Sequence, residues 1–110
     1  MVKTMIVDGI TFTEDTWWRA PGSLVAVVRH FVYGGELRPS GVFKLGHVVG
    51  YARTGKVKVR VWSSNSKRWS QPQYYKVEQI DQLDTSQLSA RHRAVVKHAR
   101  DTLLTEARRG

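Results

Sequence analysis

The sequence of 110 residues contains no cysteine. Disulfide bridges, thiolate metal ligands and a cysteine nucleophile are therefore all excluded. No apolar run approaches the roughly 20 residues that a membrane-spanning helix requires. The N-terminal segment MVKTMIVDGITF alternates like a β-strand and lacks the apolar region and the cleavage site of a signal peptide. These absences predict a cytoplasmic protein without a membrane partner.

Acidic residues are also scarce. The chain has 9 Asp and Glu against 18 Lys and Arg, which gives a formal net charge of +9. Such an excess concentrates polyanions around a protein and speeds their association with it. Nucleic acid, either DNA or RNA, is the commonest intracellular polyanion, and an anionic membrane surface or an acidic protein partner are the alternatives. The hydrophobic share of 41% is otherwise ordinary for a single globular domain.

Residues 1–83 contain short apolar segments separated by turn residues, which predicts a mostly β domain. The dipeptide Asp8-Gly9 favours a two-residue turn and so a first hairpin. Residues 24–33 are almost wholly apolar, which suits a strand buried on both faces. The glycines and the proline of residues 34–41 predict a loop. Further strands are expected over residues 42–53, 56–62 and 74–80, with a short segment around Trp69.

The composition changes at residue 84, where β-branched and aromatic residues give way to Leu, Ala, Arg and Gln. Asp84 can cap a helix with Gln87 at its third position, flanked by Leu83 and Leu88. A helix over residues 85–108 would be about 36 Å long, which exceeds the diameter of a small barrel. Its second half is therefore expected to project from the domain or to pair with a second copy in a homodimer. The apolar stripe of this helix consists of Leu88, Val95, Val96, Ala99, Leu103 and Ala107.

Residues 50–62, GYARTGKVKVRVW, predict a hairpin that turns at Thr54-Gly55. A two-residue loop there would place Ala52 opposite Val57 and Tyr51 opposite Lys58. Small and apolar side chains then share the inner face, namely Val48, Gly50, Ala52, Val57, Val59 and Val61. The outer face carries His47, Val49, Tyr51, Arg53, Lys56, Lys58, Arg60 and Trp62.

Cations interleaved with aromatic rings suit nucleic acid, because Lys and Arg neutralise phosphates and flat rings stack on unpaired bases at about 1–3 kcal/mol each. We therefore expect phosphate-dominated binding with low sequence specificity. The predicted binding residues are Tyr51, Arg53, Lys56, Lys58, Arg60 and Trp62, then Lys67, Arg68 and Trp69 in the following turn, and Arg93, Lys97 and Arg100 on the helix. The alternative is an ordinary solvated sheet face, on which lysines prevent edge-to-edge association.

Two other functions are open. Trp17 and Trp18 would mark a protein interface if both were exposed, as in an inhibitor or adaptor, although at least one is expected to close the core. Catalysis has little support, because no nucleophile or phosphate-binding motif occurs and the acidic residues lie in predicted turns. His92 and His98 are spaced unlike helical zinc ligands. We expect no enzyme, cofactor or metal, with a metal-independent nuclease as the third hypothesis.

The segment LGHVVGYARTGKVKVRVW, followed by a polar turn and YYKVEQIDQL, resembles the SH3-like small barrels, which include the KOW and Tudor families. The resemblance covers residues 42–83 and implies a five-stranded barrel over residues 1–83 with a binding role. The turn ARTGK is less glycine-rich than a KOW turn, and the helical residues 84–110 belong to neither family. A Tudor-like aromatic cage would need Tyr51, Trp62 and Trp69. The whole chain also resembles small basic proteins of phages that infect high-GC bacteria.

Overall fold

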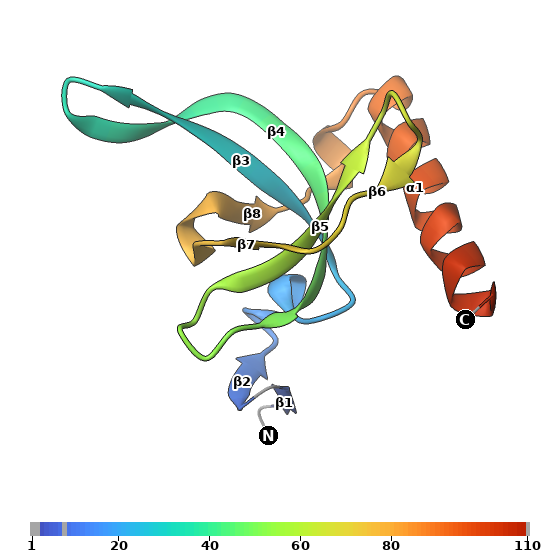
Figure 1. The fold of residues 1–110 in the computed structure, drawn as a ribbon, viewed down its shortest axis with the longest axis horizontal. Coiled ribbons are helices and arrows are strands. Elements are labelled where there is room, and N and C mark those ends of the chain that lie inside the picture. Colours follow the sequence, from blue (N-terminus) through green and yellow to red (C-terminus); the bar gives the residue numbers. More distant parts are fainter. Residues whose placement is uncertain (1–2, 8, 110) are drawn as a thin grey trace.

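A computed structural model describes residues 3–7 and 9–109, and for residues 29–32 and 37–43 it describes the backbone alone. These residues form mostly antiparallel strands followed by one long helix, which confirms the predicted fold class (Figure 1). The elements in chain order are β1 (Thr4–Val7), β2 (Ile10–Thr13), the 3-10 turn η1 (Trp17–Arg19), β3 (Leu24–Tyr33), β4 (Glu36–Tyr51), β5 (Val57–Ser63), β6 (Arg68–Trp69), β7 (Gln73–Tyr75), η2 (Val77–Gln79), β8 (Ile80–Gln82), η3 (Thr85–Gln87) and α1 (Ala90–Arg109).

The main sheet has the strand order β6-β5-β4-β3-β8, and β7 also pairs with β5. β7 and β8 lie on opposite edges and are joined by η2, so the chain crosses from one edge of the curled sheet to the other. The single strand expected over residues 74–80 is therefore wrong, because the turn η2 divides it. Branched side chains fill the inside of the sheet, and this inner core consists of Val25, Val27, Val48, Val57, Val59 and Ile80.

The hairpin of β3 and β4 extends well beyond the rest of the sheet (Figure 1). Its tip is the dipeptide Gly34-Gly35, whose φ angles of 62° and 82° fit a two-residue hairpin turn. The loop expected over residues 34–41 is therefore wrong, since pairing resumes at once with Tyr33 opposite Glu36. At the base of this hairpin Val25, Ala26 and Val27 are all buried, which confirms burial on both faces for that part of β3.

The turn between β4 and β5 is one residue longer than predicted. The Gly55 N–H donates to the Ala52 carbonyl at 3.0 Å, and the Ala52 N–H donates to the Lys56 carbonyl at 2.9 Å. Gly55 has a φ of 88°, as expected where a three-residue loop ends in a left-handed residue. Tyr51 is consequently paired with Val57 rather than with Lys58.

A bulge at Val49 changes the register a second time. Val48 pairs with Val59 and Gly50 pairs with Lys58, so the exposed Val49 has no counterpart on β5. Because side chains alternate along a strand, one extra residue exchanges inside and outside for those that follow it. Tyr51 therefore packs against the inner core, and its predicted place on the outer face is wrong. Gly50, expected inside, lies opposite the outward-facing Lys58.

Helix α1 covers the other side of β5 and β6. The buried residues between them form the helix-side core, namely Leu45, Trp62, Trp69, Val96 and Ala99. Leu88, Val95 and Leu103 of the predicted apolar stripe pack against this core, whereas Ala107 is exposed. No helix within residues 3–7 and 9–109 is long and apolar enough to cross a membrane.

The helix begins at Ala90, five residues later than the predicted start at residue 85. Asp84 does accept a hydrogen bond from the Ser86 N–H at 3.0 Å, but it caps only the short turn η3. Leu88 then adopts an extended backbone with a ψ of 148°, which ends the turn. The hydroxyl oxygen of Ser89 accepts from the His92 N–H at 3.2 Å and is the actual cap of α1.

The N-terminal residues form a small sheet of their own. β1 pairs with β2 with Val7 opposite Ile10, which confirms the first hairpin. Phe12 is buried and its ring centroid lies 5.5 Å from that of Tyr51. In η1, Trp18 packs against the inner core while Trp17 remains 36% exposed, which confirms that one of the two tryptophans closes the core.

Candidate nucleic-acid interface

Two of the aromatic residues expected to stack on bases belong to the helix-side core. Trp62 is 6% exposed and Trp69 is 4% exposed, and their rings meet edge-to-face with centroids 5.3 Å apart. The indole Nε1–H of Trp69 donates to the carbonyl oxygen of Ala99 at 3.1 Å. The predicted stacking role of these two side chains is therefore wrong, because α1 covers the strand positions that they occupy.

Tyr51 is held in place by the N-terminal segment. Its hydroxyl donates to the carbonyl oxygen of Arg19 at 2.5 Å, and its ring contacts Phe12. Burial raises the pKa of the Tyr51 hydroxyl, and the nearby charge of Arg19 acts in the opposite direction. Tyr51 therefore joins the N-terminal hairpin to the sheet instead of offering a free ring to a ligand.

Arg60 is also engaged within the protein. Its Nε–H donates to the Ser70 carbonyl at 2.9 Å, and its Nη1–H donates to Glu106 Oε2 at 2.8 Å. These contacts connect β5 to the end of β6 and to the last turns of α1. Because Glu106 pairs with its charge and two of its N–H groups already donate within the protein, we no longer count Arg60 among the groups that would bind a phosphate.

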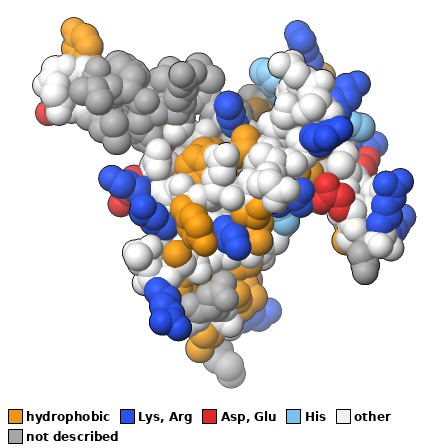
Figure 2. Space-filling view, viewed as in Figure 1, with side chains coloured by type: hydrophobic (Ala, Val, Ile, Leu, Met, Phe, Trp, Pro, Cys, Tyr) orange, Lys and Arg blue, Asp and Glu red, His pale blue; other side chains and the backbone are white. Residues whose placement is uncertain are grey.

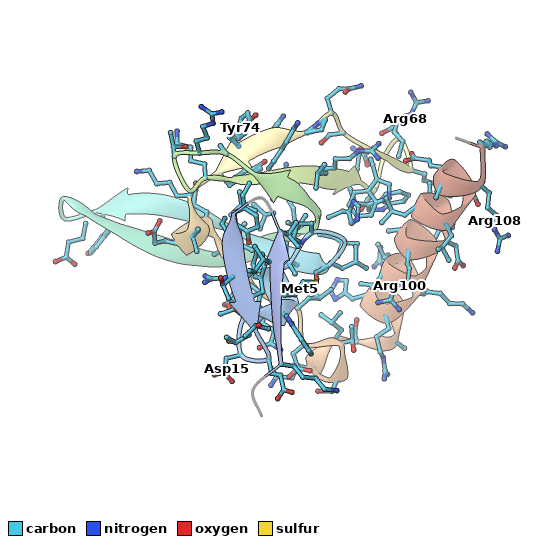
Figure 3. All side chains as sticks on the ribbon, turned by 90° about the horizontal axis from the view of Figure 1, so that it is seen from below. Met5, Asp15, Arg68, Tyr74, Arg100 and Arg108 are labelled. Carbon is cyan, nitrogen blue, oxygen red and sulfur yellow. The ribbon has the colours of Figure 1, made fainter. Side chains whose placement is uncertain are left out.

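The remaining predicted cations of the hairpin are accessible. Arg53 and Lys56 are exposed in the loop, and Lys58 is half-buried on the outer side of β5. Lys58 pairs directly with Tyr74 of β7, whose side chain is 57% exposed. Figure 3 shows Tyr74 beside β5 at the edge of the molecule. The hairpin thus has an exposed aromatic partner that the sequence reasoning did not include.

A usable signal for Tyr74 was present in the sequence. Adjacent residues of a strand point to opposite sides, so one of Tyr74 and Tyr75 must face outward wherever the other packs inside. Tyr75 packs against the inner core. Continuing the β5–β7 register by one residue brings the exposed Lys56 opposite the exposed Lys76. We call the set of Arg53, Lys56, Lys58, Tyr74 and Lys76 the β5–β7 surface.

The charged side chains in this part of the sequence are all positive. The sequence has no acidic residue between Glu36 and Glu78, a stretch that includes the whole β5–β7 surface. Like charges placed opposite each other on a sheet are destabilising, and an anionic ligand relieves that repulsion. The β5–β7 surface therefore has the charge and the exposed ring that phosphates and bases require.

The other predicted binding residues lie elsewhere. Lys67 is in the turn between β5 and β6 and Arg68 is the first residue of β6, beside the first half of α1 (Figure 1). Arg93, Lys97 and Arg100 are exposed on the helix, and Figure 3 shows Arg100 on a different side of the molecule from Tyr74. The predicted set thus separates into three groups rather than one continuous platform.

His47 has an environment that the sequence did not reveal. It pairs with Arg60 instead of the expected Trp62, and its ring centroid lies 5.9 Å from that of Trp69. Its Nδ1 is buried and has no hydrogen-bond partner among the described residues. Burial, followed by the charge of Arg60, lowers the pKa of His47, while Glu106 opposes that shift.

Within the described part of the chain, no three His, Asp or Glu side chains come together as metal ligands. The side chain of His30 lies outside the described residues. No protein-family model, curated protein or solved structure matches the chain. The resemblance to SH3-like barrels and to phage proteins therefore stays a prediction.

Proposed function

We propose that the protein is a non-catalytic nucleic-acid-binding protein that acts through the β5–β7 surface. The observation that supports this most directly is the pairing of Lys58 with the exposed Tyr74. Lys58 would neutralise a phosphate while Tyr74 stacks on an adjacent unpaired base. Arg53, Lys56 and Lys76 would add phosphate contacts, which carry no sequence information. The excess of cations over anions agrees with this proposal. The proposed site of action is the cytoplasm.

A salt titration with fluorescent oligonucleotides tests the proposal. Wild-type affinity should fall steeply with salt, because each neutralised phosphate releases counterions. The triple variant Lys56→Gln, Lys58→Gln, Lys76→Gln should bind more weakly and with a shallower salt dependence. Tyr74→Ala should lose about 5- to 150-fold in affinity for single strands, as about 1–3 kcal/mol of stacking implies, while keeping the salt dependence.

The matched control is the triple variant Lys3→Gln, Arg108→Gln, Arg109→Gln, which removes the same charge from exposed positions elsewhere. An equal loss in both triple variants would show that only net charge matters, and the β5–β7 surface would be the wrong site. Absence of binding at low salt would overturn the proposed function itself. Cleavage of the strand during prolonged incubation with RNA would instead favour the metal-independent nuclease.

A second candidate, a protein-interaction module, is favoured by exposed apolar side chains in the N-terminal part. Ile6 is 71% exposed and Trp17 is 36% exposed, and surface apolar residues of this size commonly mark partner contacts. Substitution of Ile6 and Trp17 by Ser should leave nucleic-acid binding intact. A loss of nucleic-acid affinity in this variant would assign these residues to the first function instead.

A further inference from the structure

A groove of about 340 Å³ lies between the β5–β6 turn and the first half of α1. It is separate from the β5–β7 surface and shares no residue with it. Its volume falls within the range of about 300–1,000 Å³ that is typical of small-molecule sites. Figure 2 shows Lys, Arg and His side chains gathered over this part of the molecule. The lining residues are Trp62, Ser64, Lys67, Arg91, Ala94, Val95 and His98.

Both walls of the groove are fixed by the fold. On the turn side, the Lys67 N–H donates to the Ser63 carbonyl at 2.8 Å, and Lys67 has a φ of 53°. This left-handed conformation is uncommon for a residue other than glycine, and such strained positions cluster at ligand sites. On the helix side, the hydrogen bond from Trp69 to Ala99 holds α1 against β6. The groove is therefore preformed.

The chemistry of the groove combines an apolar interior with a cationic rim. Trp62, Ala94 and Val95 supply the apolar part, and Trp62 meets the His98 ring edge-to-face at 5.7 Å. Lys67 and Arg91 supply the positive charge. No acidic residue lies between Asp84 and Asp101 or between Glu36 and Glu78, so both walls are free of carboxylates. A matching ligand is apolar on its faces and carries a negative group at its edge.

We propose that this groove binds one unpaired nucleobase together with its phosphate, so that the preferred target is single-stranded nucleic acid. This proposal rests on the proposed function and adds a second contact point to it. A base that is paired and stacked inside a duplex cannot enter such a groove, whereas a base of a single strand can. The Arg91 guanidinium stacks on the base, while Lys67 and the Ser64 hydroxyl contact the phosphate.

The lining favours a base over an acidic peptide. A carboxylate side chain would contact the cationic rim and leave the apolar interior unfilled, whereas a planar base fills the interior and its phosphate reaches the rim. A titration with an acidic peptide and with nucleotides distinguishes the two ligands.

The test fills the groove without changing charge. Ala94 is exposed on α1, so Ala94→Leu is compatible with the helix and occupies the space of the base. Ala107→Leu is the matched control, because Ala107 is exposed on the same helix and borders a different groove. Fluorescence anisotropy would measure the affinity for single-stranded RNA and DNA and for a hairpin duplex.

We expect Ala94→Leu to weaken single-strand binding by about tenfold while the duplex affinity and the Ala107→Leu control stay unchanged. Added UMP or AMP should shift the NMR signals of the Trp62 indole and of the Val95 amide, and Ala94→Leu should abolish those shifts. The variant Arg91→Gln should reproduce the loss.

The two proposals fail differently. If Ala94→Leu binds single strands normally while the Lys56, Lys58, Lys76 variant does not, the groove proposal is wrong and the proposed function stands. If an acidic peptide shifts the Trp62 and Val95 signals and nucleotides do not, the groove is a peptide site and the proposal is overturned. If no nucleic acid binds at low salt, both the proposed function and the groove proposal are wrong.

Discussion

Trp69 and Ala99 are joined by a buried hydrogen bond, in which the indole Nε1–H donates to the helix carbonyl at 3.1 Å. Trp69 lies on the short strand β6 and Ala99 near the middle of α1. This bond fixes how far along the helix the sheet makes contact. It also removes from solvent the ring that, from the sequence alone, we expected to stack on a base.

Trp69→Phe removes this hydrogen bond while keeping an aromatic ring in the helix-side core. The free energy of unfolding should fall by about 1–3 kcal/mol, because a buried carbonyl loses its second donor and a void replaces part of the indole. Urea denaturation followed by circular dichroism measures the change. Trp17→Phe, at an exposed position, should change stability by less than about 0.5 kcal/mol. Equal effects of the two substitutions would contradict the assignment of Trp69 to the core.

Gly46→Ala tests the close packing inside the sheet. A Cβ at this position would lie 2.7 Å from Val59 Cγ1 and 2.8 Å from Val27 Cγ2, which is too close unless these buried side chains shift. We expect a loss of about 1–3 kcal/mol, as is typical of an overpacked core. The double variant Gly46→Ala, Val59→Ala should be less destabilised than the sum of the single changes. Thermal unfolding measures all three, and simple additivity would contradict the predicted clash.

His47 predicts a loss of stability on mild acidification. Burial lowers its pKa in the folded state below the ordinary value of 6.5, so the unfolded chain takes up the proton first. Stability is therefore unaffected well above pH 6.5 and declines as the pH falls through that value toward the folded pKa. His47→Gln should reduce this decline, measured as the free energy of unfolding between pH 7.5 and about pH 5. An unchanged slope in His47→Gln would show that other groups cause it.

The ion pair of Arg60 with Glu106 is expected to contribute little by itself. The two side chains are 26% and 42% exposed, and pairs this accessible are worth about 0–1 kcal/mol. Glu106→Gln should therefore be nearly neutral, whereas Arg60→Met should cost more because it also leaves the Ser70 carbonyl without its donor. A double-mutant cycle in low and high salt measures the coupling. A coupling above about 2 kcal/mol would show that the pair is better shielded than its exposure indicates.

The sequence predicted the elements that depend on local pattern. The alternation of β5, the first hairpin and the apolar stripe of the helix follow from side-chain periodicity, and each is present in the structure. It did not predict the start of α1, because both Asp84 and Ser89 are good caps. Only the extended backbone at Leu88, which packs into the helix-side core, decides between them.

The site was predicted less well than the fold, for a physical reason. Whether an aromatic residue of a strand is free to stack depends on what covers that strand, and sequence spacing does not report such coverage. Trp62 was correctly assigned to the face opposite the valines, but that face is the one on which α1 packs. Lys58 was correctly expected to face outward, and its aromatic neighbour Tyr74 comes from a strand that pairs only in the tertiary structure.

The bulge at Val49 divides β4 into two parts whose inward side chains have different contacts. Up to Val48 the inward side chains meet the inner core, and after Gly50 the inward Tyr51 contacts both that core and the N-terminal hairpin. Substitution of Val49 changes a single exposed side chain. If Val49 instead took a regular place in the ladder opposite Lys58, Tyr51 would turn outward and the N-terminal hairpin would lose its anchor. What matters at this position is therefore that Val49 stays outside the ladder, and not which side chain it carries.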